Sequence, residues 1–88
     1  MNQTIWKYTL GLVDEQILSV PVGGEFISAQ IQDGRICVWA VVSPEAIQRN
    51  RSILIAGTGA PLSPWLCHYI GTVQMDQFVW HIFEQVKP

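Results

Sequence analysis

The sequence lacks the long apolar run that a membrane span requires. No stretch approaches about 20 consecutive apolar residues, and residues 1–7 lack the charged and apolar regions of a signal peptide. Charge is also scarce: charged residues make up 14% of the chain and apolar residues 49%. We therefore expect an ordered, soluble protein of the cytoplasm that does not contact a membrane, because so apolar a chain can bury enough surface to offset its ordering entropy.

Residues that carry out catalysis or hold metals are few. There are two cysteines, two histidines and seven acidic residues. Cys67 and His68 are adjacent, and neighbours on a strand point to opposite faces, so one ion could not easily use both. His81 is interpreted as a polar residue on the outer face of the last hairpin, and Cys37 as a buried free thiol. We expect no catalytic residues, no metal site and no cofactor, so the chain is not predicted to be an enzyme.

Basic residues form no run, and the net charge is −2. This distribution argues against binding of duplex nucleic acid. A chain of 88 residues is one domain, 1–88, with much surface for its volume. Four tryptophans, three phenylalanines and many branched aliphatic residues cannot all be hidden in so small a domain. We therefore expect a homo-oligomer.

The strongest local signal is a hairpin. Two β-rich runs, residues 25–32 and 35–42, are joined by Asp33-Gly34, and a type I′ turn requires positive φ at both central positions. The second run is apolar on both sides, with Cys37, Trp39 and Val41 on one of them. It is predicted to be a central strand covered twice, by a second sheet or by another subunit.

Five further short strands are expected, with turn signals between them. A strand ending at Pro21 should be short or at a sheet edge, since proline cannot donate to a ladder. Residues 43–50 indicate a single helical turn or a loop, and residues 60–66, with two prolines, must be irregular. The other strands are predicted over residues 4–10, 16–20, 51–56, 68–74 and 78–83. About seven short strands indicate an all-β fold, a small antiparallel sandwich or open barrel.

One group of residues is a candidate ligand site. Gly57-Thr58-Gly59 follows a predicted strand, and its glycines would let backbone N–H groups approach an anion, although a plain positive-φ strand exit explains them as well. Arg49 and Arg51 lie just before this strand, where they would contact phosphate or be solvated surface charges. Trp65, in the irregular segment, is either the plug of a groove or an anchor for a partner, including a stacked base.

Several short motifs together carry a resemblance. They are Trp6-Lys-Tyr8, Gln30-Ile-Gln-Asp-Gly34, Gly57-Thr-Gly59, Tyr69-Ile-Gly-Thr72 and Val79-Trp-His-Ile-Phe83. Over nearly its whole length the chain resembles a family of small proteins encoded by bacteriophages and prophages, which has no assigned activity. That family often has histidine after the Gly-Thr-Gly, where this chain has Ala60, and this favours binding over catalysis. The resemblance implies a role inside a host cell, such as inhibition of host defence.

The expected function is therefore that of a non-catalytic, phage-derived binding protein that counters host defence. In its most concrete form, it sequesters a small phosphorylated nucleotide-type signal in a pocket where subunits meet. Arg49 and Arg51 would supply charge, residues 57–59 backbone donors, and Trp65 a stacking surface. The alternative is a protein–protein inhibitor of a host enzyme, or a small structural oligomer, with no small-molecule ligand.

Overall fold

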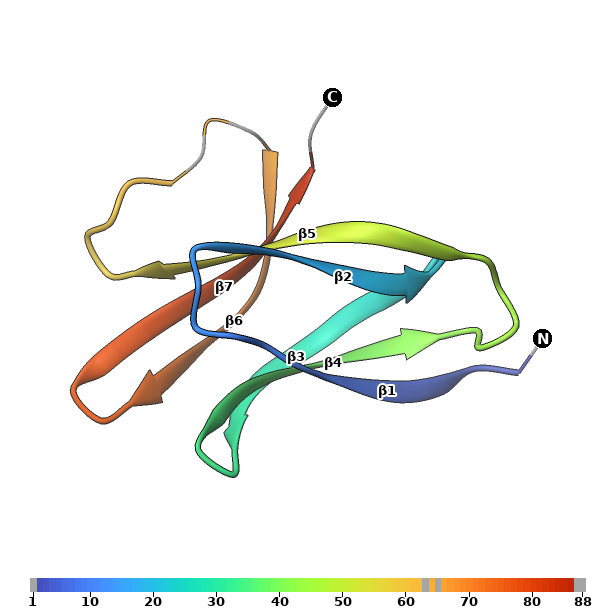
Figure 1. Cartoon of the computed structure of the whole chain (residues 1–88), viewed down its shortest axis with the longest axis horizontal. Coiled ribbons are helices and arrows are strands. Elements are labelled where there is room, and N and C mark those ends of the chain that lie inside the picture. The colour runs from blue at the N-terminus through green and yellow to red at the C-terminus, as the bar shows by residue number, and fades with distance from the viewer. Residues whose placement is uncertain (1, 63, 65, 87–88) are drawn as a thin grey trace.

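The computed structural model describes residues 2–62, 64 and 66–86, and these form seven β-strands and no helix (Figure 1). The all-β prediction is confirmed. None of the described residues belongs to a helix that could cross a membrane. The strands are β1 (Thr4–Thr9), β2 (Glu15–Pro21), β3 (Glu25–Gln32), β4 (Arg35–Val42), β5 (Gln48–Gly57), β6 (Leu66–Met75) and β7 (Phe78–Val86).

The strands form two antiparallel sheets that pack face to face. One sheet has the order β1-β4-β3 and the other β2-β5-β7-β6, so the fold is a sandwich and not a closed barrel. The central position predicted for the apolar strand is confirmed, since β4 lies between β1 and β3. The edge position predicted from Pro21 is also confirmed, because β2 is the first strand of its sheet and Pro21 is its last residue.

The two hairpins follow from their turn residues. The bounds of β3 and β4 are those predicted, and Asp33 and Gly34 have φ values of 53° and 75°. In the second hairpin Asp76, with φ of 55°, begins the link between β6 and β7. Aspartate tolerates this left-handed conformation better than most residues, which is why both turns can use it.

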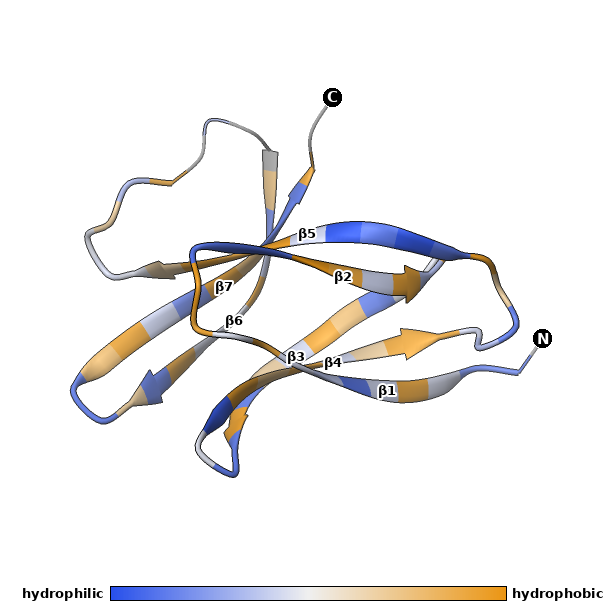
Figure 2. Cartoon of the chain, in the orientation of Figure 1, coloured by the Kyte–Doolittle hydropathy of each residue, from blue (hydrophilic) through white to orange (hydrophobic). Residues whose placement is uncertain are grey.

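The segment before β5 is a loop with a single turn, one of the two predicted alternatives, and the strand is longer than predicted. The chain makes one turn in which Ala46 N–H donates to Ser43 O at 3.0 Å, and β5 begins at Gln48, three residues before the predicted start. Figure 2 shows that the start of β5 is hydrophilic. Residues 48–50 carry no apolar alternation, and only their pairing with β2 makes them a strand.

The core lies between the two sheets, and β3 of one sheet crosses β6 of the other at close range. A Cβ atom added to Gly71 of β6 would lie 2.9 Å from Ala29 Cβ of β3. The register shifts by one residue beside each of these positions, between Phe26 and Ser28 and between Tyr69 and Gly71. The buried cluster consists of Leu10, Ala29, Ile36, Val38, Ile53, Ile55, Val73 and Ile82. Cys37 is a buried free thiol, as expected.

Candidate functional site

The residues predicted to bind a ligand lie toward opposite ends of β5. Arg51 and Gly57 are six residues apart on one strand, which separates their Cα atoms by about 20 Å. Gly57, Thr58 and Gly59 do lie together in a turn, where Gly59 has φ of 90° and Ala60 N–H donates to Gly57 O at 3.0 Å. Trp65 is outside the described residues. Within one chain, the arginines and the glycine turn therefore do not form a single site.

Arg51 is already engaged with groups of its own chain. Its Nε and Nη2 atoms donate to the two carboxylate oxygens of Glu84 on β7, and Nη1 donates to Gly24 O at 3.0 Å. The guanidinium also lies over the Phe26 ring, 5.1 Å from its centroid. The hydrogen bond to Glu84 raises the pKa of Arg51, so this charge is permanent. Arg49, two residues earlier, is exposed.

A chain of side-chain hydrogen bonds ties the glycine turn to the four-stranded sheet. Thr58 Oγ1 lies 2.8 Å from His81 Nε2, and His81 Nδ1 lies 3.1 Å from Thr72 Oγ1. Thr72 Oγ1 in turn lies 2.6 Å from the Tyr69 hydroxyl. This network was not predicted, because Thr58 and His81 are 23 residues apart and only the β5–β7 register brings them together.

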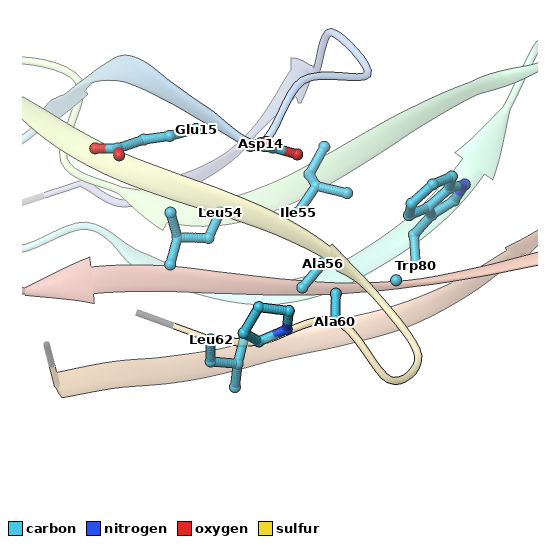
Figure 3. Close-up of a pocket in the computed structure, with 10 residues that line it drawn as sticks. Asp14, Glu15, Leu54, Ile55, Ala56, Ala60, Leu62 and Trp80 are labelled. Atoms are coloured by element: carbon cyan, nitrogen blue, oxygen red, sulfur yellow. The ribbon is translucent and has the colours of Figure 1, made fainter. Parts of the chain in front are cut away.

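Beside this turn lies a cleft of about 450 Å³, between the start of β2, the end of β5 and residues 60–62 (Figure 3). Its size is that of a typical ligand pocket. Leu54, Ile55, Leu62 and Trp80 give it apolar surface, and Asp14 and Glu15 lie on the β2 side. Gly57 also lines the cleft, and it is the one lining residue that the sequence proposed for ligand binding, because the lining residues come from four separate segments.

The charge at the cleft is negative. Among its described lining residues there are two carboxylates and no lysine, arginine or histidine. Glu15 accepts a hydrogen bond from Ser52 Oγ at 2.7 Å, and in Figure 3 its carboxylate points away from that of Asp14. The Asp14 carboxylate is exposed and lies beside Ile55. An anion such as phosphate would be repelled here, and a cationic group would be attracted.

The cleft also contains the end of a strand edge. The bond from Ile55 N–H to Asp14 O, at 3.0 Å, joins β5 to the residue just before β2, and β5 continues for two residues beyond it (Figure 1). Along a strand, the N–H and C=O groups of one residue point to one edge, and those of the next residue point to the opposite edge. The C=O of Ile55 therefore faces Asp14, and the N–H of Gly57 faces the same side, beyond the start of β2.

A second open surface is the outer face of the three-stranded sheet. Ile5 and Ile27 are 56% and 51% exposed, and they flank the partly exposed Trp39 at a groove of about 280 Å³. Lys7 Nζ donates to Gln32 Oε1 at 2.6 Å across the other half of this face. The second sheet covers the inner side of β4, whereas no described segment covers this apolar patch of Ile5, Ile27, Trp39 and Val41.

In the part of the chain that the structure describes, no three histidine, cysteine or acidic side chains gather as a metal site. A family model, described as a domain of unknown function (DUF7352), matches residues 1–88. No curated protein and no solved structure matches the chain.

Proposed function

The chain belongs to the DUF7352 family over its whole length, and from its surfaces we propose that it is a non-catalytic domain that binds a partner protein. The observation that carries this proposal is the composition of the cleft: an apolar lining, with carboxylates on one side and no cation among its described residues. Such a cleft fits an apolar side chain of a partner with a basic group beside it.

The phosphorylated-ligand hypothesis has less support. Arg51 has its donors committed to Glu84 and Gly24, and Arg49 lies more than 20 Å along the strand from the glycine turn. The Asp14 carboxylate lies at the cleft beside that turn and disfavours an anion. A nucleotide site would therefore need arginines from a second chain.

The resemblance to phage- and prophage-encoded proteins supplies the setting of the proposal. In that setting the partner is a protein of the bacterial host, and binding to this partner inhibits its role in defence. The cleft has the chemistry of a binding surface: its two carboxylates have no neighbouring histidine or cysteine among the described residues that line it. Binding alone, without turnover, is what such an inhibitor requires.

We further propose that the chain assembles with copies of itself through the apolar patch on the three-stranded sheet. β4 is apolar on both sides, and a second copy would cover the side that the other sheet does not. Ile5→Lys should lower the oligomer mass measured by light scattering. Ile17→Lys is the matched control, because Ile17 is also 56% exposed but lies on the other sheet. Equal masses for both variants would contradict this assembly.

The test of the binding function begins with the protein as purified from cells. Native mass spectrometry with denaturing release should find no nucleotide-sized mass, and a partner pulled down from host lysate should be lost with Leu62→Asp but retained with Asp33→Asn. Leu62 is half-exposed in the cleft, so its replacement should leave the fold intact. A released nucleotide, or a partner retained by Leu62→Asp, would overturn the proposal.

A further inference from the structure

We propose that the outer face of the four-stranded sheet carries a second binding site, for a neutral sugar, formed by a row of polar side chains: Thr58, His81, Thr72 and Tyr69. The site goes beyond the proposed function, because it uses β6 and β7 rather than the carboxylates at the start of β2. Three features carry it: a β-bulge that places two side chains on one face, hydrogen-bonding groups with spare capacity, and an exposed aromatic ring beside an uncharged groove.

The bulge in β6 determines which side chains share the outer face. Ile82 belongs to the core, so its neighbours on β7, His81 and Phe83, point outward. Tyr69 is opposite Phe83 and Thr72 is opposite His81, so both lie on that outer face. Residues three apart on a regular strand point to opposite faces, and the one-residue register shift after Tyr69 is what places these two together. Bulges re-aim side chains in this way beside functional sites.

The row of polar groups has one hydroxyl hydrogen to spare. Thr58 Oγ1 and Thr72 Oγ1 lie 2.8 and 3.1 Å from the two ring nitrogens of His81, and the Tyr69 hydroxyl lies 2.6 Å from Thr72 Oγ1. Three hydroxyls and a neutral imidazole supply four donors, whereas the row contains three bonds. One O–H is therefore free in either tautomer of His81: at Thr58 in one, and at Thr72 or Tyr69 in the other.

A neutral polyol fits this row better than a charged group does. Each sugar hydroxyl both donates and accepts, so it uses the free O–H and the remaining oxygen lone pairs in either tautomer of His81. An ammonium group only donates, and a carboxylate or phosphate anion only accepts. The described residues that line the groove beside Thr58 include no lysine, arginine, aspartate or glutamate. An ionic ligand would find no opposite charge among them.

Apolar contact comes from the Tyr69 ring and from the groove. Tyr69 is 62% exposed, and its ring is held by the bond to Thr72 and by contact with the Phe83 ring, with 5.6 Å between the centroids. Phe83 and Leu62 line the groove, whose volume of about 200 Å³ suits one sugar ring. The C–H groups on one face of a pyranose pack against an aromatic ring, while its hydroxyls reach the polar row.

The first experiment titrates the full, isotope-labelled chain with the methyl glycosides of glucose, galactose, mannose and N-acetylglucosamine and follows the chemical shifts of the backbone amides. At least one glycoside should give saturable shifts at Thr58, Tyr69 and Thr72, with a dissociation constant in the millimolar range because one small ring makes few contacts. Glucosamine and glucuronic acid, which carry opposite charges, should bind more weakly. No saturable shift at these amides, or tightest binding by a charged sugar, would overturn the proposal.

The second experiment compares variants with the tightest-binding glycoside. Tyr69→Ala should weaken binding about tenfold because it removes the ring, and Thr72→Val about fivefold because it interrupts the polar row. Phe78→Ala is the matched control and should bind equally well. Phe78 is also an exposed aromatic residue, 52% exposed, but it stacks on Trp80 and lies on the other side of β7 from Phe83. Equal losses for Tyr69→Ala and Phe78→Ala would contradict the assigned site.

Tyr69→Phe tests the hydroxyl alone in a chain that keeps the ring packing. It should weaken binding about threefold and leave the circular dichroism spectrum unchanged, which separates loss of the site from loss of the fold. Sugar binding that persists undiminished in Tyr69→Phe, Tyr69→Ala and Thr72→Val would place the sugar elsewhere and overturn the proposal. Thr72→Val should still capture the partner protein of the cleft, so failure of the sugar site would leave the proposed function standing.

Discussion

The two ends of β5 place charge in opposite situations. At the end we call closed, Arg51 is surrounded by Glu84, Gly24 O and the Phe26 ring. At the end we call open, Asp14 lies exposed beside an apolar cleft, and the strand edge at Gly57 faces that cleft. The ten-residue strand thus carries, toward one end, a charge that the fold has paired, and beside its other end lies a charge of another segment that the fold has left at the surface.

This contrast separates structural groups from binding groups in the molecule. A charge whose hydrogen bonds are completed within the chain contributes to stability and has little left to offer a ligand. A carboxylate beside apolar surface is available to a partner that brings the opposite charge. Changes at the closed end should therefore alter stability, and changes at the open end should alter binding.

The largest expected effect is at the closed end. Glu84→Leu leaves the mostly buried Arg51 guanidinium without its partner, and we expect a loss of about 2–3 kcal/mol in the free energy of unfolding, measured with urea. The double variant Arg51→Met, Glu84→Leu should recover most of this loss. Arg49→Met, the exposed control on the same strand, should change stability by less than about 0.5 kcal/mol. An equally large loss of stability for Arg49→Met would contradict the distinction between the paired Arg51 and the exposed Arg49.

Two glycines, one beside each end of β5, should also respond differently to substitution. A Cβ atom at Gly24 would lie 2.8 Å from Val20 Cγ1 and 3.1 Å from Pro21 O, in rigid surroundings. Gly24→Ala should therefore cost about 1–3 kcal/mol. At Gly57 the nearest atom is Trp80 Cζ3, at 3.3 Å. Gly57→Ala should stay within about 1 kcal/mol, because the lower conformational entropy of the unfolded chain offsets the cost of a small shift of the ring. Both variants would be compared by thermal unfolding. Equal losses of stability would contradict this expected difference between the two glycines.

A smaller effect is expected from the bond that holds the glycine turn. Thr58→Val removes the hydrogen bond to His81 at an exposed position, so global stability should fall by about 1 kcal/mol or less. The amide hydrogen of Ala60, which donates to Gly57 O, should exchange faster because the turn is less restrained. Unchanged exchange at Ala60 would show that the turn keeps its position without His81.

The smallest effect at neutral pH concerns Tyr8, near Arg51. Its hydroxyl is buried without a hydrogen-bond partner among the described residues, so Tyr8→Phe should change stability by less than about 0.5 kcal/mol. Burial raises the pKa of Tyr8, and the charge of Arg51 partly opposes this. Above pH 10 the unfolded chain loses this proton before the folded chain does, so stability should fall as pH rises. The free energy of unfolding, measured with urea, should fall less from pH 8 to pH 10.5 for Tyr8→Phe than for the unaltered chain.

Much of the fold was readable from local patterns. Asp33-Gly34 predicts a type I′ turn because few residues accept two successive positive φ angles, and that turn sets the register of β3 and β4. Pro21 predicts an edge because it lacks the N–H that a central strand needs. The start of β5 was not readable, since residues 48–50 are polar and become a strand only by pairing with β2.

The candidate site was readable only in part. The glycines at 57 and 59 indicate a turn, and a turn is found there. Nothing local indicates that Arg51 meets Glu84, 33 residues away, or that Asp14 and Leu62 lie on the same cleft. An arginine next to a glycine turn in the sequence suggests a phosphate site, but an extended strand separates them by its length.

Local patterns account for the strands other than the start of β5, for the turns and for the central place of β4, because backbone sterics and the two-residue period act between neighbours. The packing of distant strands accounts for the pairing of Arg51, the joining of Thr58 to His81, and the cleft at the end of β5. These depend on the registers of β2 and β7 against β5, and on the point where the chain changes sheets after Leu10. Contacts between distant residues follow from the packing of whole strands, which no local pattern encodes.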